Sequence, residues 1–352
     1  MEGRSMKYHL PLILEEYERL GIRQQLDYDK FYLYSIITHS TAIEGSTVTE
    51  IENRLLFDEG ISANKPMPEQ LMNLDLKAAY ERGFAMAKKH TAYSVAMLCK
   101  LAALVMKNTG SDYKTIAGDF SSAKGDLRRV NVRAGRGGKS YLAWQKIRDR
   151  LEEFCRWLNG ERKIISKKDV QGIYELSFEA HYRIATIHPW ADGNGRISRL
   201  VMNMIQHEAD VVPSVVKKNK RADYIKTISR SQEKEESSGF LSFMLRHHCE
   251  NLLQEIEEYK TSVNNEGGQK QRVVRKGGQK RKGGQKRWSE TTVRAYEIIS
   301  EKPAITRKEL SEELGINPSA VQKHIARLKE EGAIERVGGA RGGYWKIKGK
   351  LT

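Results

Sequence analysis

From His188 to Arg199 the chain reads His-Pro-Trp-Ala-Asp-Gly-Asn-Gly-Arg-Ile-Ser-Arg, and this stretch indicates where the reactive centre of the fold lies. Gly193 and Gly195 permit a tight turn with positive φ and leave no Cβ to block a close ligand. Where such a turn opens a helix, successive backbone N–H groups form a concave nest, and the helix dipole adds positive potential. Arg196 and Arg199 are three residues apart, so they share one helical face and can reach the same polyphosphate. The sequence therefore predicts a phosphate cradle.

The first half of the same stretch carries groups for acid–base and metal chemistry. Asp192 offers a hard oxygen ligand for Mg²⁺ held jointly with phosphate oxygens. His188 titrates near neutral pH and can accept a proton, and Pro189 biases it toward an extended backbone. Taken singly, a histidine is usually an ordinary surface or core residue, a Gly-x-Gly a turn, and a helical arginine pair a solvated face. Their conjunction within twelve residues favours a reaction centre.

Apolar residues recur at three- and four-residue spacing along most of the chain up to about Lys260, which predicts a mainly α-helical fold. Directly after the motif, one such stripe is formed by Ile197, Leu200, Val201, Met204 and Ile205. Other representative predicted helices are Lys30–Glu44, Pro68–Lys89, Ala92–Lys107, Leu142–Leu158, Val170–Ile187 and Phe240–Tyr259.

Composition divides the chain into four regions. We predict an N-terminal helical region at 1–110, a catalytic core at 111–262, a basic Gly-rich linker at 263–288 and a winged helix-turn-helix domain at 289–350. Gly-Gly-Gln-Lys occurs three times in the linker, where glycine entropy and like-charge repulsion disfavour packing. From Asn264 to Thr352 there are 21 Lys and Arg against 10 Asp and Glu, while the preceding residues carry 40 against 35. Contact with nucleic acid is therefore expected in the tail.

Cysteine usage and the length of apolar runs indicate the compartment. Cys99, Cys155 and Cys249 lack the spacing of disulfides or metal ligands, as expected in a reducing cytosol. The N-terminus has no signal peptide, and no apolar run reaches the roughly 18 residues of a membrane span. We therefore expect a cytoplasmic protein that makes no membrane contact.

The tail is typical of three helices followed by a two-stranded ribbon, which is a winged helix-turn-helix. The predicted elements are Glu290–Ser300, Arg307–Leu314, Ser319–Gly332, Ala333–Val337 and Gly343–Lys348. Gly315 turns the chain, Asn317 or Ser319 can cap the next helix, and Arg336 to Arg341 lie in a wing. The predicted small core comprises Leu310, Leu314, Ile316, Val321, Ile325 and Leu328.

The second helix of this motif would turn Gln322, Lys323, His324 and Arg327 outward, as in domains that read the major groove. DNA binding through residues 289–350 is one interpretation, favoured by nine Lys and Arg against one Glu between Glu266 and Arg287. A protein-contact or dimerisation module is the other, because a fold does not dictate function.

The segment His188–Arg199 resembles the Fic-family signature, His-Pro-Phe-x-Asp/Glu-Gly-Asn-Gly-Arg-x-x-Arg, and Trp190 for phenylalanine is the one difference. The resemblance covers about residues 30–260 and implies an all-helical fold with a short β-hairpin flap. It implies that His188 deprotonates a protein hydroxyl, which attacks the α-phosphorus of ATP while pyrophosphate leaves. Further implied roles are Mg²⁺ binding by Asp192, a phosphate cradle of Gly193, Asn194 and Gly195, phosphate contact by Arg196, a hold on the γ-phosphate by Arg199, and a nucleotide pocket near Asn203 and Tyr224.

Within the helical region up to about Lys260, the alternating segment from Leu127 to Arg133 is the exception, and it predicts a short exposed hairpin. It resembles the flap of the Fic family, which holds a target's backbone in register by strand addition. An ordinary surface hairpin is the alternative. The implied target-binding residues are Leu127, Arg128, Arg129, Val130, Asn131 and Val132.

Upstream, Ser40-Thr41-Ala42-Ile43-Glu44-Gly45 resembles the inhibitory motif of the same family, Ser/Thr-x-x-x-Glu-Gly/Asn. The resemblance implies that Glu44 pairs with Arg199. An arginine forked onto a carboxylate cannot also receive a γ-phosphate, so ATP would bind with its α-phosphate out of line. The alternative is a plain helix stop with Gly45 as the C′ residue.

Together these features predict an autoinhibited, homodimeric protein adenylyltransferase that moves AMP from ATP, with Mg²⁺, to Ser, Thr or Tyr of a target protein. Two other readings stay open. One is a DNA-binding regulator whose Fic domain only senses nucleotide. The other is an enzyme that removes AMP, with Glu44 positioning a hydrolytic water. A different donor such as UTP also stays open, because base selectivity depends on the shape of the pocket.

Overall fold

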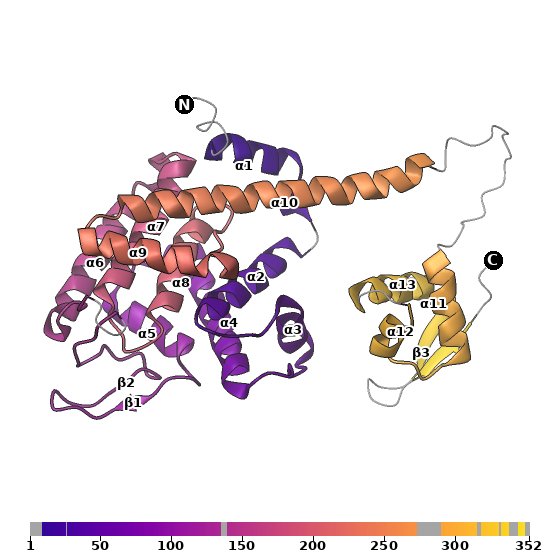
Figure 1. Ribbon diagram of the computed structural model, residues 1–352, viewed down its shortest axis with the longest axis horizontal. Helices are drawn as coiled ribbons and strands as arrows, with labels where there is room; N and C mark the ends of the chain where they lie inside the picture. Colours follow the sequence, from indigo (N-terminus) through magenta and orange to yellow (C-terminus); the bar gives the residue numbers. More distant parts are fainter. Residues whose placement is uncertain are drawn as a thin grey trace. The chain divides into compact units, whose positions relative to one another are not determined.

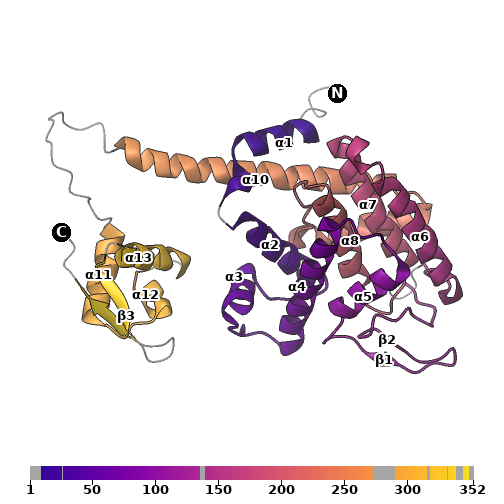
Figure 2. The ribbon, with the colours of Figure 1, turned by 180° about the vertical axis from the view of Figure 1, so that it is seen from behind.

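The computed structural model describes residues 9–25, 27–134, 139–272, 290–314, 318–330, 332–337 and 344–348. The chain divides into two compact units, Met1–Gln271 and Arg272–Thr352. The predicted mainly helical fold is confirmed, as Figures 1 and 2 show from opposite sides. The larger unit contains helices α1 (Leu10–Arg19), α2 (Tyr28–Ile43), α3 (Glu50–Arg54), α4 (Met67–Lys88), α5 (Val95–Val105), α6 (Ile147–Arg162), α7 (Val170–Ile187), α8 (Asn194–Glu208), α9 (Arg221–Lys234) and α10 (Ser238–Arg272).

Helix α8 lies at the centre of this unit, packed against α7 and α4. The stripe predicted on it is completely buried: Ile197, Leu200, Val201, Met204 and Ile205 are each 0% exposed. Gly83 lets α4 approach closely, because a Cβ there would lie 2.9 Å from the sulfur of Met204. The N-terminus of α8 is thereby fixed by the core of the domain.

Helices α6 and α10 differ most from the sequence prediction. Helix α6 begins at Ile147 instead of Leu142, because residues before it form a loop and a 3-10 turn, and the Trp144 backbone N–H donates to the Asn131 side chain (3.0 Å). Helix α10 continues to Arg272, beyond the predicted end at Tyr259 and into the predicted linker. Extending an existing helix costs far less than nucleating one, which accounts for the overrun. Residues 273–288 of the linker, and Ser289 after it, lie outside the described residues.

The predicted hairpin at Leu127–Val132 is only partly formed. Among the described residues, pairing consists of a bridge between Arg133 and Ser140 and two backbone hydrogen bonds, from Tyr141 N–H to the Val132 carbonyl (3.0 Å) and from Ala134 N–H to the Lys139 carbonyl (3.1 Å). The ladder in this unit is instead formed by β1 (Asp112–Tyr113) and β2 (Phe120–Ser121), which are antiparallel and were not predicted. The expectation of an exposed segment is wrong for Arg128, which is 1% exposed because backbone carbonyls attract its side chain inward.

Helix α2 ends as the glycine rule predicts. Gly45 has φ of +107°, its N–H donates to the Ala42 carbonyl (3.2 Å), and the Ser46 N–H donates to the Thr41 carbonyl (3.1 Å). This is a Schellman motif with Gly45 at C′. The motif places Glu44, the last residue before the turn, at a fixed point on the end of α2.

The smaller unit has helices α11 (Glu290–Glu301), α12 (Arg307–Leu314) and α13 (Pro318–Glu330) and antiparallel strands β3 (Ile334–Val337) and β4 (Tyr344–Ile347). This confirms the predicted winged helix-turn-helix. Its core includes the predicted Leu310, Val321, Ile325 and Leu328, and also Ala295, Ile299, Ile305 and Trp345. Gly315, Ile316, Asn317 and wing residues 338–343 lie outside the described residues, as do the side chains of Ser319 and Lys323.

One predicted recognition residue turns away from the outer face of α13. Gln322 and Arg327 are exposed, but the Nδ1 atom of His324 lies 2.9 Å from the hydroxyl of Thr292 on α11. A ring nitrogen can pair with a neighbouring hydroxyl within the domain, a contact that helical periodicity does not reveal. Among the described residues, no helix is long and apolar enough to span a membrane.

Candidate active site

His188 occupies the turn between α7 and α8. Its backbone is left-handed (φ 53°, ψ 60°), and its N–H donates to the Ile184 carbonyl (2.9 Å). The predicted extended backbone is therefore wrong: the hydrogen bond that ends α7 outweighs the steric preference imposed by Pro189. The ring is stacked on Tyr141, with centroids 3.8 Å apart. Burial lowers the pKa of His188 to about 4, which keeps the imidazole neutral and able to accept a proton.

The loop after His188 is fastened to the core by Trp190 and Asn194. Trp190 is 1% exposed and its indole N–H donates to the Gly125 carbonyl (3.2 Å), which fits the anchoring role of an aromatic residue. The side-chain amide of Asn194 makes two hydrogen bonds to the backbone of Trp190. It accepts from the Trp190 backbone N–H (3.1 Å) and donates to the Trp190 carbonyl (2.8 Å). The side chain of Asn194 therefore holds the loop in shape, and its backbone contributes to the start of α8.

Both glycines of the motif lie where a side chain would collide. Gly193 has φ of +82°, and a Cβ there would lie 2.9 Å from the Met106 sulfur. A Cβ on Gly195 would lie 2.6 Å from Oε1 of Glu44 and 3.1 Å from Nη1 of Arg199. The start of α8 thus presents bare backbone to an acidic group, as an anion nest requires.

Arg196 is 2% exposed, and its hydrogen bonds are incomplete. Its guanidinium donates to the Val105 carbonyl (3.4 Å) and the Met106 sulfur (3.0 Å), and Nη2 lies 3.5 Å from Oδ2 of Asp192. Its Nε is buried without a partner among the described residues. A buried guanidinium with an unused donor beside a nest of N–H groups fits a phosphate ligand.

The position and exposure of Asp192 suit a ligand of a metal ion. Its Oδ1 accepts from the Gly193 N–H (2.6 Å), and its side chain is 58% exposed. No cluster of three or more metal-ligating side chains exists in the described part of the chain. A carboxylate next to a phosphate cradle suits Mg²⁺, which is commonly held by one or two carboxylates together with phosphate oxygens.

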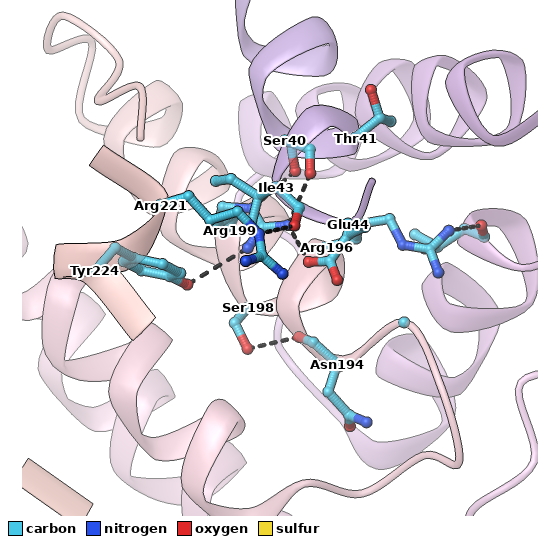
Figure 3. Close-up of polar contacts among 12 residues, drawn as sticks. Ser40, Thr41, Ile43, Glu44, Asn194, Arg196, Ser198, Arg199, Arg221 and Tyr224 are labelled. Atoms are coloured by element: carbon cyan, nitrogen blue, oxygen red, sulfur yellow. Dashed lines mark hydrogen bonds and ion pairs between the residues drawn. The ribbon is translucent and has the colours of Figure 1, made fainter. Parts of the chain in front are cut away.

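Arg199 is 3% exposed and is held by α2 (Figure 3). Its Nε donates to the Ser40 hydroxyl (2.8 Å), and Nη2 donates to the Ser40 carbonyl (3.0 Å) and to Oε1 of Glu44 (2.6 Å). Nη1 donates to the hydroxyl of Tyr224 (3.4 Å). The structure therefore brings together Ser40, Glu44 and Arg199, which are far apart in the sequence.

Glu44 is negatively charged at neutral pH. Burial alone would raise its pKa, but Arg199, Arg196 and Arg221 lower it below its usual value. Arg221, at the start of α9, also donates through Nε to the Ile43 carbonyl (2.6 Å), which fastens the last turn of α2. No sequence motif marked Arg221, because nothing in the spacing of a basic run points to a carbonyl on another helix.

Tyr224 and Asn203, which the family resemblance places near the nucleotide pocket, are both almost fully buried. Tyr224 is 3% exposed, and its hydroxyl lies 2.8 Å from Nε2 of His181, so it supports Arg199 from behind instead of facing a base. Asn203 is 1% exposed; it accepts from the Tyr80 hydroxyl (2.8 Å) and lines a small cavity with Arg199 and Ser40. Tyr141 and His181 also belong to the site, and no motif marked them.

Comparison with known proteins agrees with this geometry. Residues 92–206 match the model of the Fic/DOC family, and residues 289–335 match the model described as winged helix-turn-helix DNA-binding. "Protein adenylyltransferase fic-1" of Caenorhabditis elegans is 24% identical over 240 residues, which are 67% of this chain and 43% of the relative. "Protein adenylyltransferase Fic" of Drosophila erecta is 26% identical over 206 residues, 56% of this chain and 37% of the relative. The chain thus spans less than half the length of these curated relatives.

Solved structures show the same fold. A Fic domain containing signaling protein from Bacteroides thetaiotaomicron superposes with a TM-score of 0.58 at 18% identity, covering 71% of this chain and 97% of that one. Fic-1 from Caenorhabditis elegans gives 0.55 at 20% identity and 72% coverage of both chains. A Fic family protein from Desulfovibrio desulfuricans gives 0.53 at 16% identity, covering 96% of this chain and 95% of that one.

Proposed function

Because the chain carries a Fic domain at residues 92–206 and a winged helix-turn-helix domain at residues 289–335, we propose that it is an autoinhibited protein adenylyltransferase. The reaction transfers AMP from ATP to a Ser, Thr or Tyr hydroxyl of a target protein. The named activity of the curated relatives supports this proposal. So does the presence of a neutral base, a bare-backbone anion nest and two buried arginines within one loop and one helix turn.

In this mechanism His188 takes the proton of the target hydroxyl as its oxygen attacks the α-phosphorus of ATP. The new bond is between that oxygen and phosphorus, and the bond to the β-phosphate oxygen breaks, so that pyrophosphate leaves. The backbone of Gly193–Gly195 and the guanidinium of Arg196 hold the phosphates, and Arg199 receives the γ-phosphate. Asp192 would hold Mg²⁺, which neutralises phosphate charge when bound. Such transfers depend mainly on positioning and charge stabilisation.

The observation that carries the autoinhibition is the engagement of Arg199. Three of its contacts run to Ser40 and Glu44, at 2.6–3.0 Å, and the fourth runs to Tyr224. A guanidinium has five N–H donors. These four hydrogen bonds leave Arg199 with little capacity to donate to a γ-phosphate. The carboxylate of Glu44 also covers the backbone at Gly195, where phosphate oxygens would approach.

The test is Glu44→Gly, assayed with α-labelled ATP for transfer to the protein itself or to added proteins. We expect transfer roughly 10- to 100-fold above wild type, since misaligned phosphates can cost about 10²-fold. His188→Ala in the same background should abolish transfer yet still bind ATP. Equal transfer by the Glu44→Gly and unmodified proteins would show that Glu44 is not the inhibitory residue, the brake on the site. Transfer by the His188→Ala protein would show that His188 is not the base.

Removal of AMP is the second candidate function, and the position of Glu44 favours testing it. Its side chain is 32% exposed and lies against the phosphate cradle, where a water could be held. The hydrogen bond that Oε1 of Glu44 accepts from Arg199 (2.6 Å) favours blocking over water activation. Incubating wild-type protein with an AMP-modified protein distinguishes the two, because only the second function releases AMP. Exchanging α-labelled ATP for UTP in the same assays tests donor choice.

For the tail we propose DNA binding through residues 289–350 by the full chain, with a homodimer as the assembly. The match to a DNA-binding winged helix model and the exposed Gln322 and Arg327 on α13 support it. Electrostatic binding to DNA weakens steeply with salt. A mobility shift that is lost between low and high salt is expected, and no shift at low salt favours a protein-contact module. Sedimentation of the same sample reports the oligomeric state.

A further inference from the structure

Arg128 lies beneath the loop that carries His188, with its charge almost fully buried. The side chain is 1% exposed. Its guanidinium donates to three backbone carbonyls: Nε to His188 (2.8 Å), Nη1 to Val130 (2.6 Å) and Nη2 to Leu142 (2.6 Å). Its own backbone N–H donates to the Pro189 carbonyl (3.0 Å). Burying a charge is costly unless hydrogen bonds satisfy it, and here the planar fork of arginine is what reaches three carbonyls at once.

These carbonyls belong to three separate segments. Val130 is on the first arm of the flap (residues 127–134, which include the predicted segment 127–132), and Leu142 is on its second arm (residues 139–142). His188 is the candidate base. Farther along the flap, the arms contact each other directly, through Tyr141 N–H to the Val132 carbonyl (3.0 Å) and Ala134 N–H to the Lys139 carbonyl (3.1 Å). Where the flap joins the rest of the domain, Arg128 contacts both arms and binds them to the backbone of His188.

A second contact links the same parts. The ring of Tyr141, next to Leu142 on the second arm, is stacked on the ring of His188 at 3.8 Å and 15°. His188 itself has a left-handed backbone. Such a conformation is costly for a residue other than glycine and persists where surrounding contacts over-determine it. The hydrogen bond from Arg128 to the His188 carbonyl and the stacking of Tyr141 on the His188 ring supply such contacts.

We propose that Arg128 is a positioning residue that joins the flap to His188, so that a target strand held by the flap has one fixed relation to the base. This inference rests on the proposed transferase function. General-base catalysis needs the target hydroxyl within hydrogen-bond reach of the imidazole. A flap that holds its target through backbone pairing satisfies this condition only when flap and base cannot shift relative to each other. Arg128 supplies that rigidity without touching the reacting atoms.

The charge of Arg128 also affects His188, because it lowers the pKa of the imidazole. Burial is the main cause that lowers the pKa of His188, and Arg128 lowers it further, whereas the Ala185 backbone, Asp192 and Glu44 raise it. The cation held at the His188 carbonyl therefore disfavours protonation of the imidazole and helps to keep the base neutral.

The experiment uses the full chain carrying Glu44→Gly and compares Arg128→Lys, which keeps the charge and loses the fork, with Arg128→Met, which loses both. The matched control is Arg162→Lys. Arg162 is also buried (7% exposed side chain), but it pairs with Glu208 (2.6 and 2.7 Å) at the far end of α8. We expect both Arg128 variants to lower kcat for self-modification roughly 10- to 100-fold. KM for Mg-ATP should stay within about twofold, and the control should keep its kcat per folded molecule.

Two measurements need no catalysis. Amide exchange at Ala134 and Tyr141 should accelerate in both Arg128 variants, because the flap loses the contacts that join its two arms to the backbone of His188. The pKa of His188, followed by NMR of its ring, should rise in Arg128→Met relative to Arg128→Lys. In the protein that keeps Arg128, its Nε–H should exchange slowly, and this measurement holds even if both variants fail to fold.

Unchanged amide exchange and unchanged kcat in Arg128→Lys would overturn the proposal, as would fast exchange of the Arg128 Nε–H. The outcomes separate the two ideas. If Glu44→Gly transfers no AMP while exchange and the His188 pKa respond as expected, the transferase function fails and the role of Arg128 in fixing the flap stands. If transfer is normal in all variants, the proposal for Arg128 fails alone.

Discussion

The carboxylate of Glu44 lies directly over Gly195, with Oε1 2.6 Å from the position that a Cβ on Gly195 would take. The same oxygen accepts from Arg199 Nη2 at 2.6 Å. One acidic oxygen therefore contacts both the bare backbone at the start of α8 and the guanidinium one turn later. Both are groups that a polyphosphate would use, so the carboxylate stands where an anionic ligand is expected.

Gly195→Ala tests this overlap. In the Glu44→Gly background the added methyl group no longer meets Glu44, but it still lies 3.1 Å from Arg199 Nη1. The methyl group would also occupy the bare backbone that phosphate oxygens approach, so we expect a roughly 5- to 150-fold loss of ATP affinity, which is about 1–3 kcal/mol. Calorimetry of ATP binding measures it. Stability should change little, because alanine is favoured over glycine inside a helix. Full ATP affinity in Gly195→Ala would contradict the cradle.

Arg221→Ala should release the brake in part. The Arg221 Nε donates to the Ile43 carbonyl, one residue before Glu44. Loss of a hydrogen bond from a charged donor costs about 1.5 kcal/mol, so transfer by an otherwise unmodified chain should rise roughly tenfold. Lys226→Ala, at an exposed position on the same helix, is the matched control. If both variants transfer AMP at the wild-type rate, Arg221 does not hold the brake.

The pH dependence of the released enzyme follows from His188. Burial holds its pKa at about 4, and the base is active when neutral, so activity is lost only as pH falls through this value. The profile of kcat/KM, which reports the free enzyme, should be flat near neutrality in Glu44→Gly, with an acid limb below about pH 5. Removing Glu44 takes away a group that raises this pKa, so the limb cannot move upward. A limb near the ordinary histidine pKa of about 6.5 would contradict a buried neutral base.

Asp192→Asn should raise the Mg²⁺ concentration needed for transfer in the Glu44→Gly background, because an amide oxygen is a weaker ligand than a carboxylate. The loss should be relieved by excess Mg²⁺. Titration of activity with Mg²⁺ at fixed ATP measures it. Asp210→Asn, at a side chain 88% exposed and paired with Arg23, is the control. Identical Mg²⁺ curves for both variants would exclude Asp192 as the metal ligand.

Helical periodicity predicted the larger part of the fold because α7, α8 and the tail helices bury one clear apolar stripe each. The Gly45 helix end and the pairing of Arg199 with Glu44 were also predictable, since a glycine rule and a motif pointed to them. The boundary of α6 was not, because the preceding loop is held by the Asn131 side chain, a contact without a periodic signal.

Within the site, the sequence predicted which residues lie together better than it predicted how they are oriented. The left-handed backbone of His188 depends on the end of α7, which competes with the preference imposed by Pro189. Arg128 was expected outside and lies inside, because three carbonyls from separate segments converge on it. The contacts of Tyr141 and Arg221 likewise arise from tertiary packing, and short-range sequence patterns contain no information on them.

The central claim is that a complete adenylyltransferase site is held in check by Glu44. Mass spectrometry of the full chain after incubation with Mg²⁺ and ATP tests it most directly, with the wild-type and Glu44→Gly proteins side by side. We predict covalent AMP on a hydroxyl side chain of the Glu44→Gly protein, far less on the wild type, and none when His188→Ala is added. Equal modification of the wild-type and Glu44→Gly proteins, or AMP on the His188→Ala protein, would contradict the account.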